Sequence, residues 1–225
     1  MNMSEKNQSG PLAQVFVIED HVLVREGFVA LINREPDLTV CAEADSPKLA
    51  LQMLSTMEPD LIVMDLMLQG GDGLQLIKEV RTMFGKLPIL VVTMQDESIY
   101  AERALRAGAT GYIMKENATE IFLEAIRQVL GGEIYLSRKM QGRLITKVIG
   151  GKKDLEASPV TSLTDRELHV FQLIGAGMPT REIAGKLDIS SKTVESHREN
   201  IKNKLGYSSG PVLVREAMKW VDSQQ

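Results

Sequence analysis

The chain has 225 residues, of which 44% are hydrophobic and 25% are charged, as is typical of a folded globular protein. Its apolar runs are far shorter than the ~20 residues of a membrane-spanning helix, and its polar N-terminus lacks the pattern of a signal peptide. The single cysteine, Cys41, excludes an internal disulfide and a cysteine-rich zinc module, and three widely spaced histidines argue against a histidine-based metal site. We therefore expect a cytoplasmic protein without membrane contact.

The charge is unevenly distributed along the chain. Residues 1–136 carry 11 Lys and Arg against 20 Asp and Glu. Residues 137–159 carry 6 against 2, and residues 160–225 carry 9 against 8. Such asymmetry indicates two units with different partners, joined by a basic connection.

The first half of the chain alternates between short apolar runs and helix-like segments. The apolar runs, bounded by Pro, Gly or Asp, predict strands at residues 14–19, 38–43, 60–64, 88–93 and 110–114. The other segments predict helices near residues 21–34, 46–57, 72–82, 98–107 and 118–131. Strand followed by helix five times is typical of an α/β fold with a doubly wound, five-stranded parallel sheet. Ligands bind such sheets at the carboxyl ends of the strands.

Acids, a hydroxyl and an amine follow these strands. Glu19 and Asp20 close the first strand and Asp65 the third, whereas Thr93 closes the fourth and Lys115 follows the fifth. Clustered carboxylates repel one another unless a hard cation such as Mg²⁺ joins them. A carboxylate attacking phosphorus, with an aspartyl-phosphate intermediate, fits this set. Each acid taken alone is better explained as a loop start or a helix cap, and only the whole set favours this chemistry.

At these residues the sequence resembles a response-regulator receiver domain, which has a flavodoxin-like fold. The matching segments are VFVIEDH, LIVMDLMLQGGDG, ILVVT and GYIMK, within residues 15–115. The resemblance implies that Asp65 is the phosphoacceptor. It also implies that Mg²⁺ is held by Glu19, Asp20, Asp65 and the backbone carbonyl of Met67.

The resemblance further implies a switch at the neighbouring strand ends. Thr93 would turn toward the phosphoryl group, Tyr112 would change rotamer with it, and Lys115 would bridge to phosphate. Tyr112 taken alone is better explained by core or edge packing, and only its position three residues before Lys115 favours a switch. The sequence departs from the family where Glu-Asp replaces the commoner Asp-Asp, and where residues 68–70 are Leu-Gln-Gly instead of Met-Pro-Gly. We expect the missing proline to change kinetics at most.

The two halves are joined by a helix and a tether. Residues 137–149 have the apolar spacing of a short amphipathic helix, and residues 150–160 are rich in Gly, Lys, Ser and Pro. We expect a receiver at 13–133, a connection at 134–160 and a second domain at 161–225. The basic connection is interpreted as a solvated linker, with DNA phosphates or the acidic receiver as alternative contacts.

The last 65 residues predict helices only. Thr164 followed by Glu167 forms a capping box. A short helix at 181–188, a tight turn and a longer polar helix at 191–205 form a helix-turn-helix pattern. The final helix, near 211–221, offers apolar residues as a pairing surface: Val212, Val214, Met218 and Trp220.

This segment resembles the LuxR-type DNA-binding domain through LTDRELHVFQLIGAGMPTREIAGKLDISSKTVESHRENIKNKLG. Residues 14–222 as a whole resemble NarL/FixJ-type response regulators. The resemblance implies that the 191–205 helix enters the major groove of DNA. Its candidate DNA contacts are Lys192, Thr193, Glu195, Ser196, Arg198, Glu199 and Lys202.

Two glutamates on this helix need a role, because DNA binding is dominated by phosphates. Carboxylates can accept hydrogen bonds from cytosine amino groups. Alternatively, Glu195 pairs with Arg198 and Glu199 with Lys202 at helical i,i+3 spacing. We favour base readout for Glu195 and local pairing for Glu199.

The predicted function is that of a DNA-binding response regulator of a two-component system, activated by phosphorylation of Asp65. Its expected partners are a sensor histidine kinase or a small phosphodonor, double-stranded DNA, a second copy as homodimer, and RNA polymerase as a further candidate. Beyond self-catalysed phosphoryl transfer to Asp65 and its slow reversal, no enzymatic activity is expected. Two alternatives are a phosphorylation-independent regulator and an aspartyl-phosphate phosphohydrolase. The latter usually has a second acid where this chain has Met67.

Overall fold

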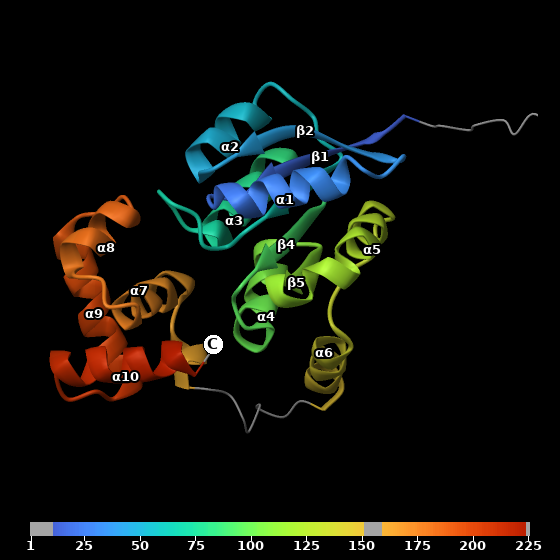
Figure 1. Cartoon of the computed structure of the whole chain (residues 1–225). Helices are drawn as coiled ribbons and strands as arrows, with labels where there is room; N and C mark the ends of the chain where they lie inside the picture. The colour runs from blue at the N-terminus through green and yellow to red at the C-terminus, as the bar shows by residue number, and fades with distance from the viewer. Residues whose placement is uncertain (1–10, 151–158, 224–225) are drawn as a thin grey trace, which may run out of the picture.

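The computed structural model describes residues 11–150 and 159–223, and its N-terminal part is a parallel sheet (Figure 1). The strands are β1 (Ala13–Ile18), β2 (Leu38–Ala44), β3 (Leu61–Met64), β4 (Ile89–Thr93) and β5 (Gly111–Met114). All neighbours pair in parallel in the order β2-β1-β3-β4-β5. The predicted five-stranded, doubly wound α/β fold is confirmed.

Helices cover both faces of the sheet. They are α1 (Val22–Ile32), α2 (Pro47–Leu54), α3 (Gly73–Phe84), α4 (Glu97–Ala107) and α5 (Ala118–Leu130). Successive side chains of a strand point to opposite faces of the sheet, so Val15 and Val17 join one core with α1 and α5. In this core the rings of Phe28 and Phe122 stack with their centroids 4.8 Å apart. Phe16 and other alternate residues join a second core with α2, α3 and α4. The sheet is therefore buried on both sides, as parallel sheets generally are.

The strand order reverses beside β1, which places the ends of β1 and β3 next to each other. The Asp65 N–H donates to the Ile18 carbonyl at 3.0 Å, fixing that register. The loop after β3 then passes closely over the start of α3: a Cβ added at Gly73 would lie 2.5 Å from the Leu66 Cα. This crevice at the switch point is where open α/β sheets bind their ligands.

The C-terminal part is helical, as predicted. After α6 (Arg138–Gly150) and the 3-10 turn η2 (Pro159–Ser162) come α7 (Asp165–Gly175), α8 (Thr180–Lys186), α9 (Ser191–Leu205) and α10 (Gly210–Asp222). The capping box of Thr164 and Glu167 is present. Most of the predicted tether, residues 151–158, lies outside the described residues. None of the helices in the two described ranges is long and apolar enough to cross a membrane.

The pairing surface predicted on α10 stays a prediction, and within it Trp220 is only partly exposed. Its ring packs on Phe171 of α7 with centroids 5.5 Å apart, and its Nε1 atom is buried. Helices α7 and α10 approach so closely here that a Cβ added at Gly175 would lie 2.4 Å from the Ala217 carbonyl oxygen. Val212 and Val214 are half-buried, and Met218 is exposed. The aromatic therefore anchors α10 within its own domain.

Candidate phosphorylation site and nucleic-acid interface

The sheet edge brings together the acids expected there. Glu19 and Asp20 follow β1, and Asp65 follows β3. One potential ligand atom from each of these acids and from His21 lies within 4.8 Å of all the others. Glu19 is 1% exposed and Asp65 is 4% exposed, so their charges interact with little screening by water.

Lys115 supplies the positive charge at this edge. Its Nζ atom lies 2.6 Å from Glu19 Oε2 and 2.6 Å from Asp65 Oδ2. Burial lowers the pKa of the Lys115 ammonium, but Asp65 and Glu19 outweigh burial and raise it. Lys115 therefore remains a cation and joins two buried carboxylates.

Part of the acidic cluster lacks well-aligned hydrogen bonds. Within the described residues, Glu19 Oε2 and Asp20 Oδ1 are buried without such a bond, although Lys115 Nζ lies 2.6 Å from the first and His21 Nδ1 lies 2.9 Å from the second. The Met67 N–H donates to Asp65 Oδ1 at 3.1 Å, which holds the Met67 peptide beside the cluster. Buried carboxylate oxygens with unused lone pairs are the hard ligands that Mg²⁺ prefers. The residues present thus fit the Mg²⁺ that receiver domains bind through acidic residues.

The proposed switch residues lie along the neighbouring strands. Thr93 is fully buried at the end of β4, and its Oγ1 accepts from the Gln95 N–H at 3.5 Å. Tyr112 of β5 is also buried, and its hydroxyl donates to the Gln95 carbonyl at 2.7 Å. Burial raises the pKa of the Tyr112 phenol well above its usual range, so it stays a donor. Gln95, which the sequence analysis did not single out, therefore links Thr93 and Tyr112.

Charged groups connect the receiver to the C-terminal helices, a contact that the sequence analysis missed. Asp165, the first residue of α7, forms two ion pairs with the receiver. Its Oδ1 atom lies 2.8 Å from Arg103 Nη1 of α4, and its Oδ2 atom lies 2.7 Å from Lys78 Nζ of α3. Arg103 also donates to the carbonyls of Leu163 at 2.8 Å and Thr161 at 3.2 Å. Arg103 thus holds both η2 and the start of α7 against α4 (Figure 1).

Both loops that border Asp65 also reach α7. In the β3–α3 loop, Asp72 caps α3, and its Oδ2 lies 3.8 Å from His169 Nδ1. Burial raises the pKa of the Asp72 carboxyl, but His169, backbone donors and Arg166 lower it, and the net shift is downward. In the β4–α4 loop, the Gln95 side chain accepts from Gln172 of α7.

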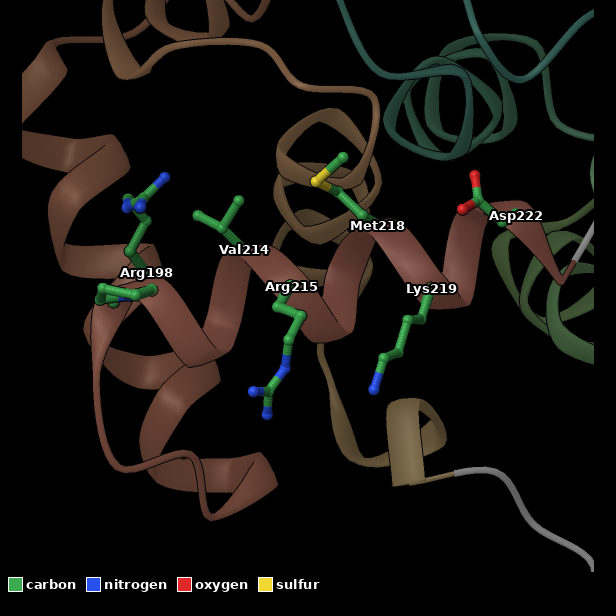
Figure 2. A pocket seen from close by; sticks show the side chains of 8 residues that line it. Arg198, Val214, Arg215, Met218, Lys219 and Asp222 are labelled. Carbon is green, nitrogen blue, oxygen red and sulfur yellow. The ribbon is translucent and has the colours of Figure 1, made fainter.

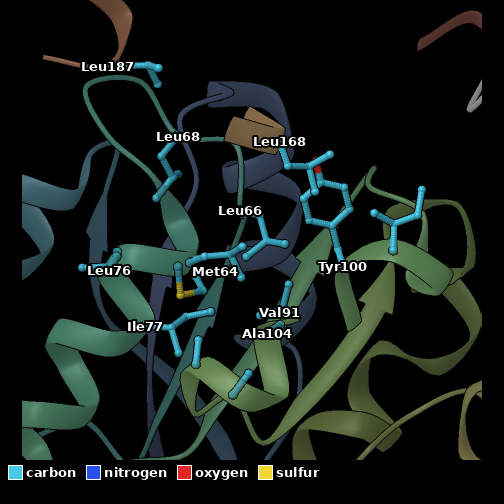
Figure 3. Packing of buried hydrophobic residues seen from close by; sticks show 14 of the residues in the cluster. Met64, Leu66, Leu68, Leu76, Ile77, Val91, Tyr100, Ala104, Leu168 and Leu187 are labelled. Atoms are coloured by element: carbon cyan, nitrogen blue, oxygen red, sulfur yellow. The ribbon is translucent and has the colours of Figure 1, made fainter. Parts of the chain in front are cut away.

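An apolar cluster runs between the two parts of the chain. Leu66 and Leu68, just after Asp65, are buried in the same continuous cluster as Tyr100, Leu168 and Leu187 (Figure 3). The sequence held one signal for this contact, because a loop with two buried leucines needs an apolar neighbour. Of the segment that departs from the usual Met-Pro-Gly, Leu68 therefore packs in this cluster, whereas Gln69 and Gly70 are exposed.

The third C-terminal helix, α9, presents its polar face to solvent. Val194 and Ile201 are buried and Leu205 is half-buried, so these apolar residues form the inward stripe of the helix. The exposed candidate DNA contacts are Lys192, Thr193, Glu195, Ser196 and Glu199; Arg198 and Lys202 are half-buried. The face is open while α7 contacts the receiver.

The local ion pair favoured for Glu199 is present on α9, and so is the alternative pair considered for Glu195. Lys202 Nζ lies 2.9 Å from Glu199 Oε1, and Arg198 Nε lies 3.7 Å from Glu195 Oε2. Glu195 also accepts a hydrogen bond from Thr180 of α8 at 2.7 Å. Arg198 lines a hollow beside α10, with Val214, Met218 and other residues (Figure 2).

The fold and the acidic sheet edge are those of a receiver-type domain, and a helix-turn-helix domain follows it. Residues 15–127 match the response regulator receiver domain, and residues 161–217 match the bacterial regulatory proteins of the luxR family. The chain belongs to the two-component response regulators that carry a LuxR-type DNA-binding domain.

Individual relatives agree over most of the chain. The oxygen regulatory protein NreC of Staphylococcus aureus (strain JH9) is 37% identical over 210 residues, which cover 92% of this chain and 97% of NreC. A LuxR-family response regulator from Aurantimonas sp. SI85-9A1 is 32% identical with a TM-score of 0.57, covering 62% of this chain and 99% of that one. RcsB from Salmonella enterica serovar Typhimurium, solved bound to promoter P1flhDC, shares the fold with a TM-score of 0.67 and 24% identity, covering 92% and 98%.

Proposed function

We propose that this protein is a cytoplasmic transcription regulator whose DNA binding is switched by phosphorylation of Asp65. Residues 13–133 form the receiver and residues 161–225 the DNA-binding domain. The phosphoryl group comes from a sensor histidine kinase or a small phosphodonor. The observation that carries the proposal is the buried triad in which Lys115 lies 2.6 Å from both Asp65 and Glu19.

The chemistry follows from these contacts. A carboxylate oxygen of Asp65 attacks phosphorus and forms the acyl phosphate, while the bond from phosphorus to the donor breaks. Glu19, Asp20, Asp65 and the Met67 carbonyl would hold Mg²⁺, which neutralises phosphoryl charge when bound. The Lys115 ammonium, already beside Asp65, then faces an added negative charge and stabilises it.

The same edge connects phosphorylation to the DNA-binding domain. Thr93 turning toward the phosphoryl group would disturb its contact with Gln95, whose side chain accepts from Gln172 of α7. The packing of α7 against α3 and α4 would weaken, and the receiver would shift toward the released, dimerising form. Tyr112, bonded to the Gln95 carbonyl, would follow this movement.

DNA recognition is assigned to α9. The nearly balanced charge of residues 160–225 neutralises few phosphates, so a single domain binds weakly. A homodimer on paired half-sites supplies the missing affinity by effective concentration. Lys192, Thr193, Ser196, Arg198 and Lys202 would contact phosphates or bases, Glu195 would read a base, and RNA polymerase is a further partner.

The test compares wild type with Asp65→Asn, using the exposed Asp45→Asn as a control. Acetyl phosphate should add one phosphoryl group to wild type and Asp45→Asn, seen by mass spectrometry, and strengthen dimerisation and DNA binding. Asp65→Asn should show neither change. A coupling free energy of ~1.4 kcal/mol corresponds to a tenfold affinity change. Equal DNA binding by all proteins under both conditions would contradict the proposal and favour a phosphorylation-independent regulator.

A second variant separates phosphorylation from its consequence. Lys115→Ala retains the Asp65 nucleophile, so it should still accept phosphate. Without the bridging ammonium, it should gain neither dimerisation nor tight DNA binding. Sedimentation of the phosphorylated variant measures this directly. Sustained turnover of a phosphomonoester by wild type would instead support a phosphohydrolase.

A further inference from the structure

We propose that His21 is an additional metal ligand, which converts the acidic cluster into a mixed oxygen and nitrogen site with a preference for transition-metal ions such as Ni²⁺ and Co²⁺. The proposal rests on the cation site of the proposed function and goes beyond its all-oxygen donor set. His21 directly follows the acidic pair, at the residue that precedes α1.

The backbone holds the imidazole over the acids. The His21 N–H donates to Glu19 Oε1 at 3.1 Å, which folds the chain back onto the Glu19 carboxylate. The ring Nδ1 then lies 3.1 Å from Glu19 Oε1 and 2.9 Å from Asp20 Oδ1. One nitrogen and two carboxylate oxygens thus converge from three consecutive residues.

These separations suit a shared cation. Adjacent ligands of an octahedral ion lie about 3.0 Å apart when each bond is about 2.1 Å, the usual length for imidazole nitrogen and carboxylate oxygen. The distances from His21 Nδ1 to Asp20 Oδ1 and Glu19 Oε1, 2.9 and 3.1 Å, match this separation between adjacent ligands. Asp20 Oδ1 is buried, and its contact with His21 Nδ1 at 2.9 Å lacks hydrogen-bond geometry, as expected of two ligands that face one ion.

The two carboxylate oxygens of Glu19 contact different residues, Lys115 and His21. Its Oε2 atom lies 2.6 Å from Lys115 Nζ, whereas its Oε1 atom lies near His21. The nitrogen ligand and the ammonium therefore contact different oxygens of the Glu19 carboxylate. The His21 side chain is 69% exposed, which leaves room for water or a phosphoryl oxygen to complete the coordination.

The donor set determines which ions benefit. Carboxylates and carbonyls suit Mg²⁺ and Mn²⁺, whereas imidazole suits Ni²⁺, Zn²⁺ and other transition metals. His21 should therefore add affinity for Ni²⁺ or Co²⁺ and contribute little to Mg²⁺. The contrasting role, in which His21 only neutralises the acids, predicts no such difference between ions.

The experiment is a titration of metal-free, tag-free full-length protein with Ni²⁺ and, separately, with Mg²⁺, followed by calorimetry. The variants are His21→Ala and the control His197→Ala, which removes a histidine from α9 instead. His21→Ala should weaken Ni²⁺ binding by at least about tenfold and leave Mg²⁺ binding within about twofold. Co²⁺ absorption spectra should lose the nitrogen-ligand signature only in His21→Ala, and matching thermal midpoints would verify that both variants fold.

Each outcome is decisive. Equal weakening of both ions, or no change for either, would overturn the role of His21 as a ligand. Failure of wild type itself to bind Mg²⁺ would instead contradict the cation site of the proposed function. Retained Ni²⁺ binding in His21→Ala together with loss in His197→Ala would place the nitrogen ligand elsewhere and also overturn the inference.

Discussion

The receiver edge and helix α9 both concentrate charged side chains, but they hold them in opposite ways. At the receiver edge Glu19 and Asp65 are 1% and 4% exposed and share the half-buried Lys115. On α9 the side chains of Glu195 and Glu199 are 57% and 61% exposed, and their partners lie one turn away.

The difference follows from access to water. Charges at the receiver edge interact strongly because water is excluded, so one added phosphoryl group can alter the balance of the whole site. Charges on α9 are screened and are worth little to folding. A buried cluster therefore suits a switch, and an exposed helix suits the recognition of DNA.

The largest expected effect on stability comes from removing Lys115, the cation of the receiver edge. Lys115→Ala leaves two buried carboxylates without their cation and should lower the free energy of unfolding by about 3 kcal/mol. Saturating Mg²⁺ should recover part of the loss. Urea unfolding in EDTA and in Mg²⁺ measures both effects. Arg106→Ala removes an i,i+4 pair from a 74% exposed arginine and should cost less than about 0.5 kcal/mol. Equal losses for the two variants would contradict the comparison.

The next effect concerns the contact of α4 in the receiver with η2 and α7 of the C-terminal domain. Arg103 is 15% exposed and joins Asp165 with carbonyls of η2 and its neighbours. Arg103→Ala should weaken the docking of α7 by roughly 1.5–3 kcal/mol, because its hydrogen bonds involve a charged group. Small-angle scattering should then show a more extended chain. Arg106→Ala, on the same helix, should keep the wild-type profile, and an unchanged profile for Arg103→Ala would refute the role of this contact.

The residues of the receiver edge could be predicted because they are fixed by local patterns. Glu19 and Asp65 directly follow apolar strands and Thr93 ends one, and parallel strands bring their carboxyl ends together. The capping box of Thr164 and Glu167 likewise needs only four consecutive residues. Sequence periodicity alone therefore gives the sheet, its helices and the acidic edge.

The contacts between the two parts of the chain could not be predicted in this way. Arg103 and Asp165 are 62 residues apart, and their pairing depends on how two folded units dock. Trp220 lies on an amphipathic helix whose spacing does not reveal which apolar residue turns toward Phe171. Gln95 is an ordinary loop residue until Tyr112 and Gln172 are placed on either side of it.

A third prediction tests whether burial or domain identity decides the strength of a charge pair. Glu167 of the DNA-binding domain is 4% exposed and lies 2.6 Å from Lys204. Burial raises the pKa of its carboxyl, but Lys204 and Thr164 outweigh burial and lower it. The folded pKa is below the unfolded value of about 4.3, so the carboxylate stabilises the protein above that pH and loses this effect as pH falls.

Thermal unfolding of the full chain from neutral to acidic pH should show this loss. Wild type should be more stable than Glu167→Gln near neutrality, and the difference should shrink as the pH falls through the folded pKa. Glu216→Gln provides the control, because Glu216 is paired with Arg215 and Lys219 at the surface. Its effect should be small at every pH. A constant difference for Glu167→Gln would exclude the ion pair as its cause.

The smallest effects on stability are expected on α9, where the readout is DNA binding. Lys202→Ala should weaken binding to all sequences and reduce the salt slope by about one, as expected for one lost phosphate contact. Glu199→Gln should act in the opposite direction, because Glu199 holds Lys202 at 2.9 Å and its loss frees the lysine for DNA. Glu195→Ala should relax preference at one base pair if it reads a base. Binding titrations over a range of salt concentrations separate these cases, with unfolding measured in parallel.

All three variants should have a free energy of unfolding within about 0.5 kcal/mol of the wild-type value. A stability loss for Lys202→Ala as large as that for Lys115→Ala would mean that the exposed charges of α9 support the fold as the buried ones do.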